Sequence, residues 1–358
     1  MKEVIKTLKP YVPEASLEEV KKKYNLSRLV RLSANENPYG TSQAVYKAVE
    51  AVIRQGGNYY PDGNASALRK ELAAFYKQPE DRLVIGTGLD ELIALICRVF
   101  LQSGDEVLVM DPAFSEYAFN SEIEGASIKK VPVNKDTGHI DVDEIIKAVT
   151  DKTKLLWICN PNNPTGVYES KACITNLMAQ LPSDVIVLMD EAYLEFTCQE
   201  EAPSALPLLD RYDNLIVMKT FSKAYGLAAY RVGFVVASVK LANYMQTVRL
   251  PYNVNTISQV AAQAALGDQA FLHKVVKAND EERRKWLAFL SKVAIDHYDS
   301  QSNFIYMRFE EAEELADYLL QHGYQVRRGL QPHWLRITIG KADDNQAIQG
   351  YIKEFLGE

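Results

Sequence analysis

Six short apolar runs, separated by segments of helix length, occupy the middle of the chain. They read RLVIG, DEVLVMD, KLLWICN, DVIVLMDEAY, NLIVMKT and RVGFVVA. Each run is apolar at nearly every position, which is typical of parallel strands that helices cover on both faces. The alternation of such strands with helical segments predicts an α/β fold.

The pattern changes beyond residue 240. A long amphipathic helical stretch covers residues 261–293. The runs NFIYMRF, QVRRG and HWLRITIG then indicate strands that pack with the helices EEAEELADYLLQHG and DNQAIQGYIKEFL. We therefore expect an amino-terminal arm, a large domain and a smaller α+β domain that contacts the arm, with boundaries at 1–30, 31–240 and 241–358.

Composition and charge exclude several classes of protein. Of the 358 residues, 47% are hydrophobic and 24% are charged, as in an ordinary folded domain. The formal net charge of -7, without a basic stripe, argues against nucleic acid as the main partner. No apolar run approaches the ~20 residues of a membrane span, and the first residues lack the apolar stretch of a signal peptide.

Cysteines and histidines carry no disulfide or metal signature. The four cysteines form no C-x-x-C pair, so we expect reduced thiols in a cytoplasmic protein. The five histidines never fall at metal-ligand spacing. We therefore expect no metal site.

The segment TFSKAYGLAA places Lys223 just after an apolar strand. The hydroxyls of Thr220 and Ser222 flank this lysine, and Arg231 follows eight residues after it. A lysine that forms a Schiff base needs an amine that loses its proton near neutral pH, and a phosphate needs hydroxyl donors and a fixed positive fork. The segment therefore suits a Schiff-base lysine beneath a phosphorylated cofactor, although a surface lysine and an ordinary ion-pair arginine are the alternatives.

In open α/β sheets, ligands bind beyond the carboxyl ends of the strands, so the residues after each apolar run are candidates for a site. After LVIG, the sequence TGLDEL opens a helix whose first N–H groups, around Gly88, Leu89 and Asp90, can bind an anion. A tight structural turn is the alternative there. After VLVMD, Phe114 either lies against a planar ring or packs in the core.

Two further strand ends carry polar groups. The loop NPNNPTG is either a structural loop held by Asx turns or a functional one, in which the amide of Asn163 donates to a ring oxygen. Asp190 follows VIVLM, where a buried carboxylate requires a cationic partner. That partner is either a pyridinium nitrogen or a structural arginine or lysine. Tyr193 comes after the same strand as Asp190, and Lys223 comes after the next strand. Because these polar residues lie at the ends of successive strands, a common site is favoured.

The ordered motifs NPNNPTG, DEAY, SKAYGLAAYR and LRITIG resemble the fold-type I aminotransferases that use pyridoxal 5′-phosphate (PLP). Within them, SANENPYG, NYYPDG and SNF are most similar to the histidinol-phosphate aminotransferase family. The resemblance runs from about Lys9 to the carboxyl terminus. It implies a PLP-binding large domain with a mostly parallel mixed sheet flanked by helices, and a smaller α+β domain.

The resemblance also implies a role for each motif residue. Lys223 would bind PLP covalently and move the substrate's Cα proton, and Asp190 would keep the pyridine nitrogen protonated. Tyr193 and Asn163 would bind the ring oxygen, and Phe114 would stack on the ring. The cofactor phosphate would be held by Gly88, Leu89, Asp90, Thr220, Ser222 and Arg231.

Tyr60 in NYYPDG matches a tyrosine that, in this family, reaches the cofactor phosphate of the neighbouring subunit. The resemblance thus implies a homodimer with shared active sites. The small-molecule substrates would be L-histidinol phosphate and 2-oxoglutarate, bound through Arg336 with support from Arg327, Tyr11 and Asn35. Arginine suits both substrates because its planar fork pairs with carboxylate and phosphate.

The segment GLQPHW, beside the expected anion site, is shorter than the family pattern. This departure leaves open an aromatic-amino-acid aminotransferase, and a PLP-dependent decarboxylase of a phosphorylated amino acid is a further alternative. A PLP-binding domain of a transcription regulator is disfavoured, because the roughly thirty residues before SANENPYG are too few and too little basic for a helix-turn-helix module.

Overall fold

The computed structural model describes residues 2–8, 15–200 and 203–357, and its largest element is a seven-stranded sheet. The strands are β2 (Leu83–Gly86), β3 (Glu106–Asp111), β4 (Ser127–Pro132), β5 (Thr153–Cys159), β6 (Ile186–Asp190), β7 (Leu215–Thr220) and β8 (Gly233–Ala237). Their order is β2-β8-β7-β6-β5-β3-β4. β8 runs antiparallel to β2 and β7, and the other pairs are parallel.

Six of these strands coincide with the six apolar runs, which confirms the predicted α/β fold with a mostly parallel, mixed sheet. The remaining strand, β4, was not predicted. It lies at the edge of the sheet with the sequence SIKKVP, and Val131 is its buried residue. An edge strand that buries so little side-chain surface does not need an apolar run.

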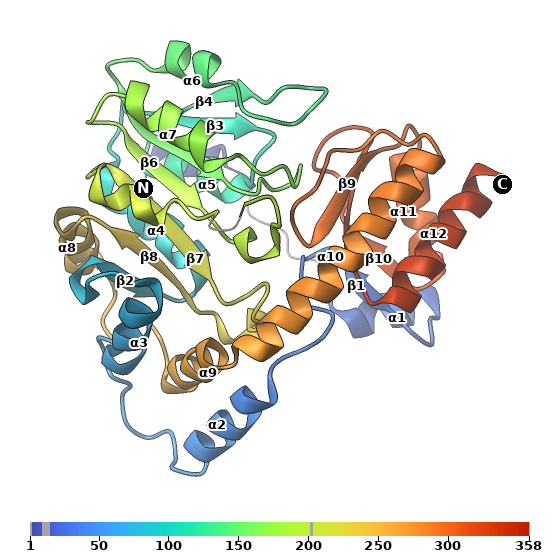
Figure 1. The fold of residues 1–358 in the computed structure, drawn as a ribbon, viewed down its shortest axis with the longest axis horizontal. Helices are drawn as coiled ribbons and strands as arrows, with labels where there is room; N and C mark the ends of the chain where they lie inside the picture. Colours follow the sequence, from blue (N-terminus) through green and yellow to red (C-terminus); the bar gives the residue numbers. More distant parts are fainter. Residues whose placement is uncertain (1, 9–14, 201–202, 358) are drawn as a thin grey trace.

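Helices flank the large sheet (Figure 1). The α-helices of this part are α2 (Gln43–Ile53), α3 (Ser66–Tyr76), α4 (Gly88–Phe100), α5 (Ser115–Ile123), α6 (Val142–Ala148), α7 (Lys171–Gln180), α8 (Val239–Val248) and α9 (Thr256–Gly267). Short 3-10 helices are η1 (Glu3–Lys6), η2 (Glu80–Arg82), η3 (Leu194–Phe196), η4 (Leu206–Asp210) and η5 (Ala228–Tyr230). Every helix among the described residues is too short or too polar to cross a lipid bilayer.

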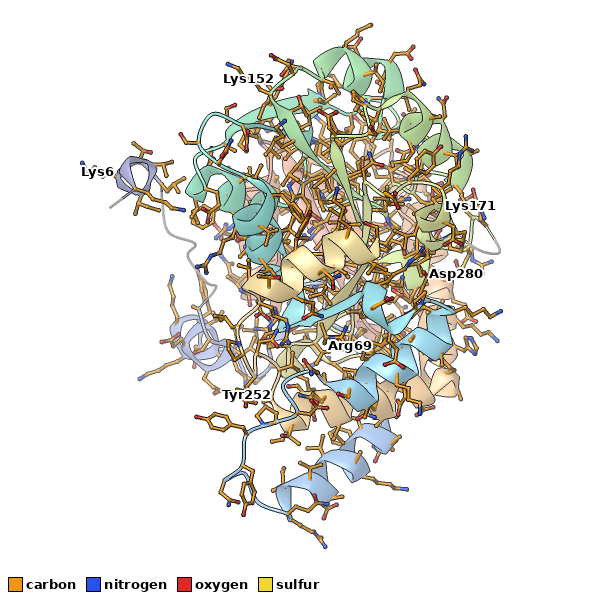
Figure 2. All side chains as sticks on the ribbon, turned by 90° about the vertical axis from the view of Figure 1, so that its left-hand side faces the viewer. Lys6, Arg69, Lys152, Lys171, Tyr252 and Asp280 are labelled. Carbon is orange, nitrogen blue, oxygen red and sulfur yellow. The ribbon has the colours of Figure 1, made fainter. Side chains whose placement is uncertain are left out.

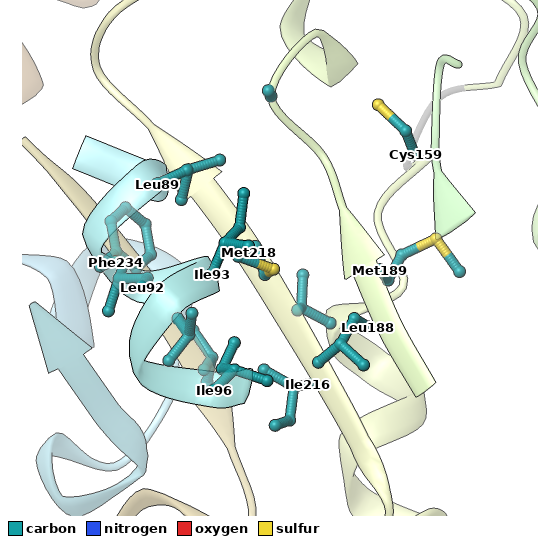
Figure 3. Packing of buried hydrophobic residues seen from close by; sticks show 14 of the residues in the cluster. Leu89, Leu92, Ile93, Ile96, Cys159, Leu188, Met189, Ile216, Met218 and Phe234 are labelled. Carbon is teal, nitrogen blue, oxygen red and sulfur yellow. The ribbon is translucent and has the colours of Figure 1, made fainter. Parts of the chain in front are cut away.

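Helix α4 is fixed to the sheet by its apolar face. Leu92, Ile93 and Ile96 are fully buried, and Figure 3 shows them beside Ile216 and Met218 of β7. Burial of each such side chain contributes about 1.5–3 kcal/mol. This packing holds the first turn of α4 at the edge of the sheet where the central parallel strands end.

The smaller unit contains two pairs of strands and four helices. They are β1 (Val30–Leu32), β9 (Phe304–Arg308), β10 (Tyr324–Val326), β11 (Trp334–Thr338), α1 (Leu17–Tyr24), α10 (Gln269–Lys292), α11 (Ala312–Gln321) and α12 (Ala342–Leu356). β1 pairs with β10 in parallel, β11 pairs with β9 antiparallel, and a backbone bridge between Arg327 and Arg336 connects the two pairs. The predicted smaller α+β unit is confirmed, although the short strand β1 was not predicted.

Two hydrophobic cores divide the molecule. The first surrounds the large sheet and includes buried side chains of α8, α9 and the first part of α10, such as Leu272. The second lies in the smaller unit and includes Trp286 from the later part of α10. Since α10 contributes to both cores, a domain boundary at residue 240 stays a prediction.

The described parts of the amino-terminal arm contact both units. Lys2 pairs with Glu124 at the end of α5, with 2.5 Å between Nζ and Oε2. Arg28 pairs with Asp344 of α12 at 2.6 Å. The arm therefore extends from the large sheet's helices to the smaller unit.

Candidate active site

A cleft of about 830 Å³ opens where the carboxyl ends of the central strands meet the smaller unit. It is lined by the predicted residues Asn35, Leu89, Asp90, Phe114, Asn163, Asp190, Tyr193, Thr220, Ser222, Lys223, Arg231, Arg327 and Arg336. They come from both units and from sequence positions about 300 residues apart. In the described part of the chain, no group of three or more His, Cys, Asp or Glu residues could hold a metal ion.

Lys223 follows β7 and points into the cleft. Its Nζ donates a hydrogen bond to the carbonyl oxygen of Ala34 at 3.0 Å. Burial, together with the charge of Arg336, lowers the pKa of the Lys223 ammonium to about 8. A substantial fraction of this amine is therefore neutral and nucleophilic near physiological pH.

A second lysine in the same segment has the opposite environment. Lys219 is 4% exposed and pairs with Glu191 at 3.0 Å and with Glu195 at 3.1 Å. Burial opposes the charge, but the two carboxylates outweigh this effect and raise the pKa of the Lys219 ammonium. Lys219 does not line the cleft, so the structure distinguishes Lys223 as the available amine.

Asp190 ends β6 and is 3% exposed. The Tyr117 hydroxyl donates to its Oδ2 at 2.6 Å, and the Ala192 N–H donates to its Oδ1 at 2.9 Å. Burial raises the pKa of Asp190 to about 6, although both hydrogen bonds favour the charged form. Among the described residues, no lysine or arginine forms an ion pair with this carboxylate, so a ligand cation is a suitable partner.

Tyr193 and Asn163 lie on either side of the cleft floor. The Tyr193 hydroxyl accepts a hydrogen bond from Asn35 Nδ2 at 3.1 Å. Asn163 accepts a hydrogen bond from Arg336 through its amide oxygen at 2.5 Å. Its amide nitrogen is therefore the atom that can donate to a ligand, and the Tyr193 hydroxyl still carries a proton to donate.

The first turn of α4 meets Arg231 at one end of the cleft. Pairing of Gly86 with Gly233, and of Gly233 with Thr220, brings the start of α4 level with the end of β7. Arg231 donates to the Ser222 hydroxyl at 3.4 Å and pairs with Asp90 at 2.8 Å. A helix amino terminus, a hydroxyl and a guanidinium thus lie together, which is a combination suited to binding an anion.

Gly88 keeps this anion site open. Its φ of +75° suits glycine, and a Cβ atom built there would lie 2.4 Å from a terminal nitrogen of Arg231. Any larger residue would therefore displace the guanidinium from the helix terminus.

Further arginines line the cleft from the smaller unit. Leu32 of β1 and Leu335 of β11 face the second core, so the alternation of side chains turns Arg31 and Arg336 toward the cleft. Arg327 lies opposite Arg336 across the backbone bridge and also lines the cleft. Three guanidinium groups thus border one side of the cleft.

The segment after Arg328 is supported by a stack of aromatic rings. Trp334 packs against both Tyr298 and Tyr306, at ring-centre distances of 4.9 and 4.6 Å, and the two tyrosine rings lie 6.3 Å apart. The Tyr306 hydroxyl donates to Gln331 at 3.1 Å, and Leu330 lines the cleft. The short GLQPHW segment therefore forms part of the wall beside the arginines.

Comparison with known proteins agrees with this geometry. Residues 27–350 match the family model for aminotransferase class I and II. A histidinol-phosphate aminotransferase from Limosilactobacillus fermentum is 49% identical over 357 residues, which covers 99% of both chains. The corresponding protein from Lactiplantibacillus plantarum is 46% identical over 355 residues, again covering 99% of both chains.

The chain belongs to the class I and II aminotransferase family. Its fold is similar to the crystal structure of histidinol-phosphate aminotransferase from Sinorhizobium meliloti in complex with pyridoxal-5′-phosphate, with a TM-score of 0.88. That likeness covers 99% of this chain and 98% of the other at 23% sequence identity, and it shows the shared fold.

One described residue that the sequence assigned to the site, Tyr60, does not line this aminotransferase's cleft within one chain. Tyr60 is 82% exposed and stacks on Tyr252, with ring centres 4.8 Å apart. Figure 2 shows Tyr252 at the periphery of the molecule. Tyr11 lies outside the described residues.

Two residues of the cleft were missed by the sequence interpretation. Tyr117 follows Phe114 by three positions at the start of α5, a spacing that places both residues on one side of a helical turn. Arg31 lies between Val30 and Leu32, so strand alternation could have indicated that it faces away from the second core. Tyr117 ends the run PAFSEY, of which only Phe114 was given a role, and Arg31 precedes the motif SANENPYG.

We predict that Lys223 reacts with an amine-specific label at a lower pH than an ordinary lysine. Its reactivity in cofactor-free protein should be half-maximal near pH 8, because protonated amines are not nucleophilic and its pKa is about 8. Peptide mass spectrometry after brief labelling at a series of pH values measures this midpoint.

Two controls accompany the labelling. Lys219 should stay unlabelled throughout, and R336Q should move the Lys223 midpoint upward because it removes a nearby positive charge. A midpoint near the ordinary value of 10.5 in the unaltered protein would contradict the prediction.

Proposed function

We propose that this aminotransferase uses PLP to convert L-histidinol phosphate and 2-oxoglutarate into imidazole acetol phosphate and L-glutamate, as part of histidine biosynthesis. The placement of Lys223 carries the proposal. A buried amine of lowered pKa lines the same cleft as Arg231 and the arginines of the smaller unit. Its relatives of 41–49% identity over nearly the whole chain bear the name of this activity.

The residues of the cleft fit the chemical groups of PLP. The site of Gly88, Ser222 and Arg231 suits the phosphate, because N–H groups, a hydroxyl and a guanidinium converge there. Asp190 suits the ring nitrogen, since its buried carboxylate has hydrogen-bond donors but no described ion pair. Phe114 presents an apolar surface for the ring at the wall of the same cleft.

The catalytic roles follow from these positions. Bound PLP supplies an electron-withdrawing ring that stabilises negative charge at the substrate Cα. The amine of Lys223 removes and returns the Cα proton, which its lowered pKa favours near neutral pH. Asp190 would hold the proton on the ring nitrogen by charge attraction, while Tyr193 and Asn163 would orient the ring oxygen through hydrogen bonds.

The anionic group of each substrate would bind to the arginines of the smaller unit. Arg336 is fixed by hydrogen bonds to Asn163 and to the carbonyl oxygen of Ser33, the latter at 2.6 Å. This orientation presents its planar fork to the cleft beside Lys223, where it can pair with a carboxylate or a phosphate. Arg327 would support it, and Asn35 would line the same region through its contact with Tyr193.

We also propose a homodimer with shared active sites. Tyr60 is exposed in one chain and does not line the cleft of that chain. This is expected of a residue that contributes to the active site of the neighbouring subunit. Further large apolar side chains are exposed on nearby elements, and such clusters mark interfaces. They are Tyr46, Ile53, Tyr59, Leu250, Tyr252 and Ile257. A cytoplasmic location is proposed because all four cysteines are free thiols.

The substrate assignment is tested by comparing amino donors with 2-oxoglutarate as acceptor. We expect kcat/KM for L-histidinol phosphate to exceed that for phenylalanine by tenfold or more, about 1.4 kcal/mol of transition-state binding. K223A should lose nearly all turnover and the absorbance of lysine-bound cofactor, whereas K240A, on the exposed side of α8, should retain both.

Three outcomes would overturn this assignment. A tenfold preference for phenylalanine would indicate an aromatic-amino-acid aminotransferase. Release of carbon dioxide that does not depend on 2-oxoglutarate would indicate a decarboxylase. Full turnover in K223A would show that another lysine carries the cofactor.

The anion site is tested by G88A. The added Cβ would lie 2.4 Å from the Arg231 guanidinium, so we expect the Kd for PLP to rise by roughly tenfold to a hundredfold. G104A is the matched control, because Gly104 also has a positive φ, of +96°, but has no atom within 4 Å of the added Cβ. Fluorescence titration of cofactor-free protein measures the Kd, and equal values for the two variants would reject the site.

The shared site is tested by mixing two inactive variants, K223A and Y60A. A mixed dimer contains one site with both residues intact, so reassorted subunits should recover about a quarter of the wild-type activity. If Tyr60 served its own chain, neither site of a mixed dimer would contain both residues and no activity would return. Analytical ultracentrifugation of each variant verifies that dimers form.

A further inference from the structure

Tyr117 makes the shorter of the two hydrogen bonds that hold the Asp190 carboxylate. Its hydroxyl lies 2.6 Å from Oδ2, compared with 2.9 Å for the Ala192 N–H and Oδ1. Both residues are almost completely buried, at 1% and 3% exposure. Each oxygen of the carboxylate thus has one donor on the protein side, which fixes the plane of the carboxyl group.

The ring of Tyr117 is itself immobilised. It stacks on Trp157 of β5, with ring centres 4.7 Å apart and planes inclined by 7°. Phe114 meets it edge-on at 5.6 Å. The ring therefore has little freedom to rotate, and the hydroxyl is delivered to Asp190 by packing from α5 on one side and β5 on the other.

The surroundings of Asp190 disfavour its charged form, and this hydrogen bond opposes that effect. Burial raises the pKa of its carboxyl group, and the negative charges of Asp90 and Glu191 act in the same direction. The Tyr117 hydroxyl and the Ala192 N–H oppose that shift because they bind the charged form. Cys159, at the end of β5, is a neighbour of the Tyr117 hydroxyl. Burial raises the pKa of its thiol, so the thiol stays neutral.

We propose that Tyr117 is a positioning residue: its O–H keeps the Asp190 carboxylate charged and aimed at the ring nitrogen of the cofactor. This inference rests on the proposed function, because the ring nitrogen belongs to PLP. One turn at the start of α5 then has two tasks. Phe114 faces the plane of the ring, and Tyr117 controls the acid that pairs with the ring's edge.

Y117F distinguishes the positioning role from a purely structural role, in which the ring alone would matter. It keeps the ring and its stack on Trp157 but removes the donor, so one carboxylate oxygen loses its only described partner on the protein. A buried carboxylate without that donor takes up a proton more readily, and a neutral carboxyl group no longer holds a proton on the ring nitrogen.

The test uses the full chain loaded with PLP that carries ¹⁵N in its ring. In wild-type protein, the ¹⁵N resonance should report a protonated ring nitrogen. In Y117F it should move toward the resonance of the unprotonated ring, and kcat should fall by roughly tenfold to a hundredfold with KM changed less than kcat. The Kd for PLP should rise as well.

W157F separates packing from hydrogen bonding. It disturbs the stacked pair but retains the Tyr117 hydroxyl, and the Trp157 indole nitrogen has no hydrogen-bond partner among the described residues to lose. We expect W157F to lower the unfolding temperature while leaving the ¹⁵N resonance in place. The opposite pattern, with the resonance moved in W157F and unmoved in Y117F, would overturn the proposal.

The experiment also separates this inference from the proposed function. Wild-type protein that binds no PLP would refute the function itself. Wild-type protein that binds PLP, together with a Y117F variant of unchanged resonance, Kd and kcat, would refute only the role of Tyr117.

Discussion

The buried guanidinium of Arg336 connects the two units of the active site. It donates to the carbonyl oxygen of Ser33, next to β1, and to Asn163, in the loop after β5. Hydrogen bonds to these two oxygens orient the guanidinium. Its positive charge helps to lower the pKa of Lys223. Burial is the larger cause of that lowered pKa, and the docked smaller unit adds to it through Arg336.

At the strand ends, the side chains that line the cleft and the charged side chains that form a buried ion pair point to opposite faces of the sheet. Consecutive strand residues point to opposite faces, so Asp190 faces the cleft while Glu191 turns away, and Thr220 faces it while Lys219 turns away. Glu191 and Lys219 pair at 3.0 Å in the interior and join the ends of β6 and β7. Separating these buried partners would cost several kcal/mol, so the pair fixes the strand ends on which the cleft depends.

The sequence predicted those site residues that lie just after the ends of parallel strands. Because such strands end at one edge of a sheet, Asn163, Asp190 and Lys223 could be expected together without knowledge of the fold. The contact of Tyr117 with Asp190 could not, because it joins residues 73 positions apart and depends on how α5 packs. Tyr60 shows a different limit: within one chain its exposed ring stacks on Tyr252, and the role proposed for it would require a second copy of the chain.

The two anion sites differ in a way that matches two kinds of ligand. Arg231 pairs with Asp90 near the surface, where both side chains are substantially exposed and an ion pair contributes only about 0–1 kcal/mol. A phosphate can therefore replace Asp90 at little cost and then gain the N–H groups of α4. Arg336 is buried, and its neutral partners prevent it from turning away. An exposed, exchangeable pair suits a cofactor that binds once, whereas a rigid buried fork suits substrates that are exchanged in every cycle and must be placed accurately against Lys223.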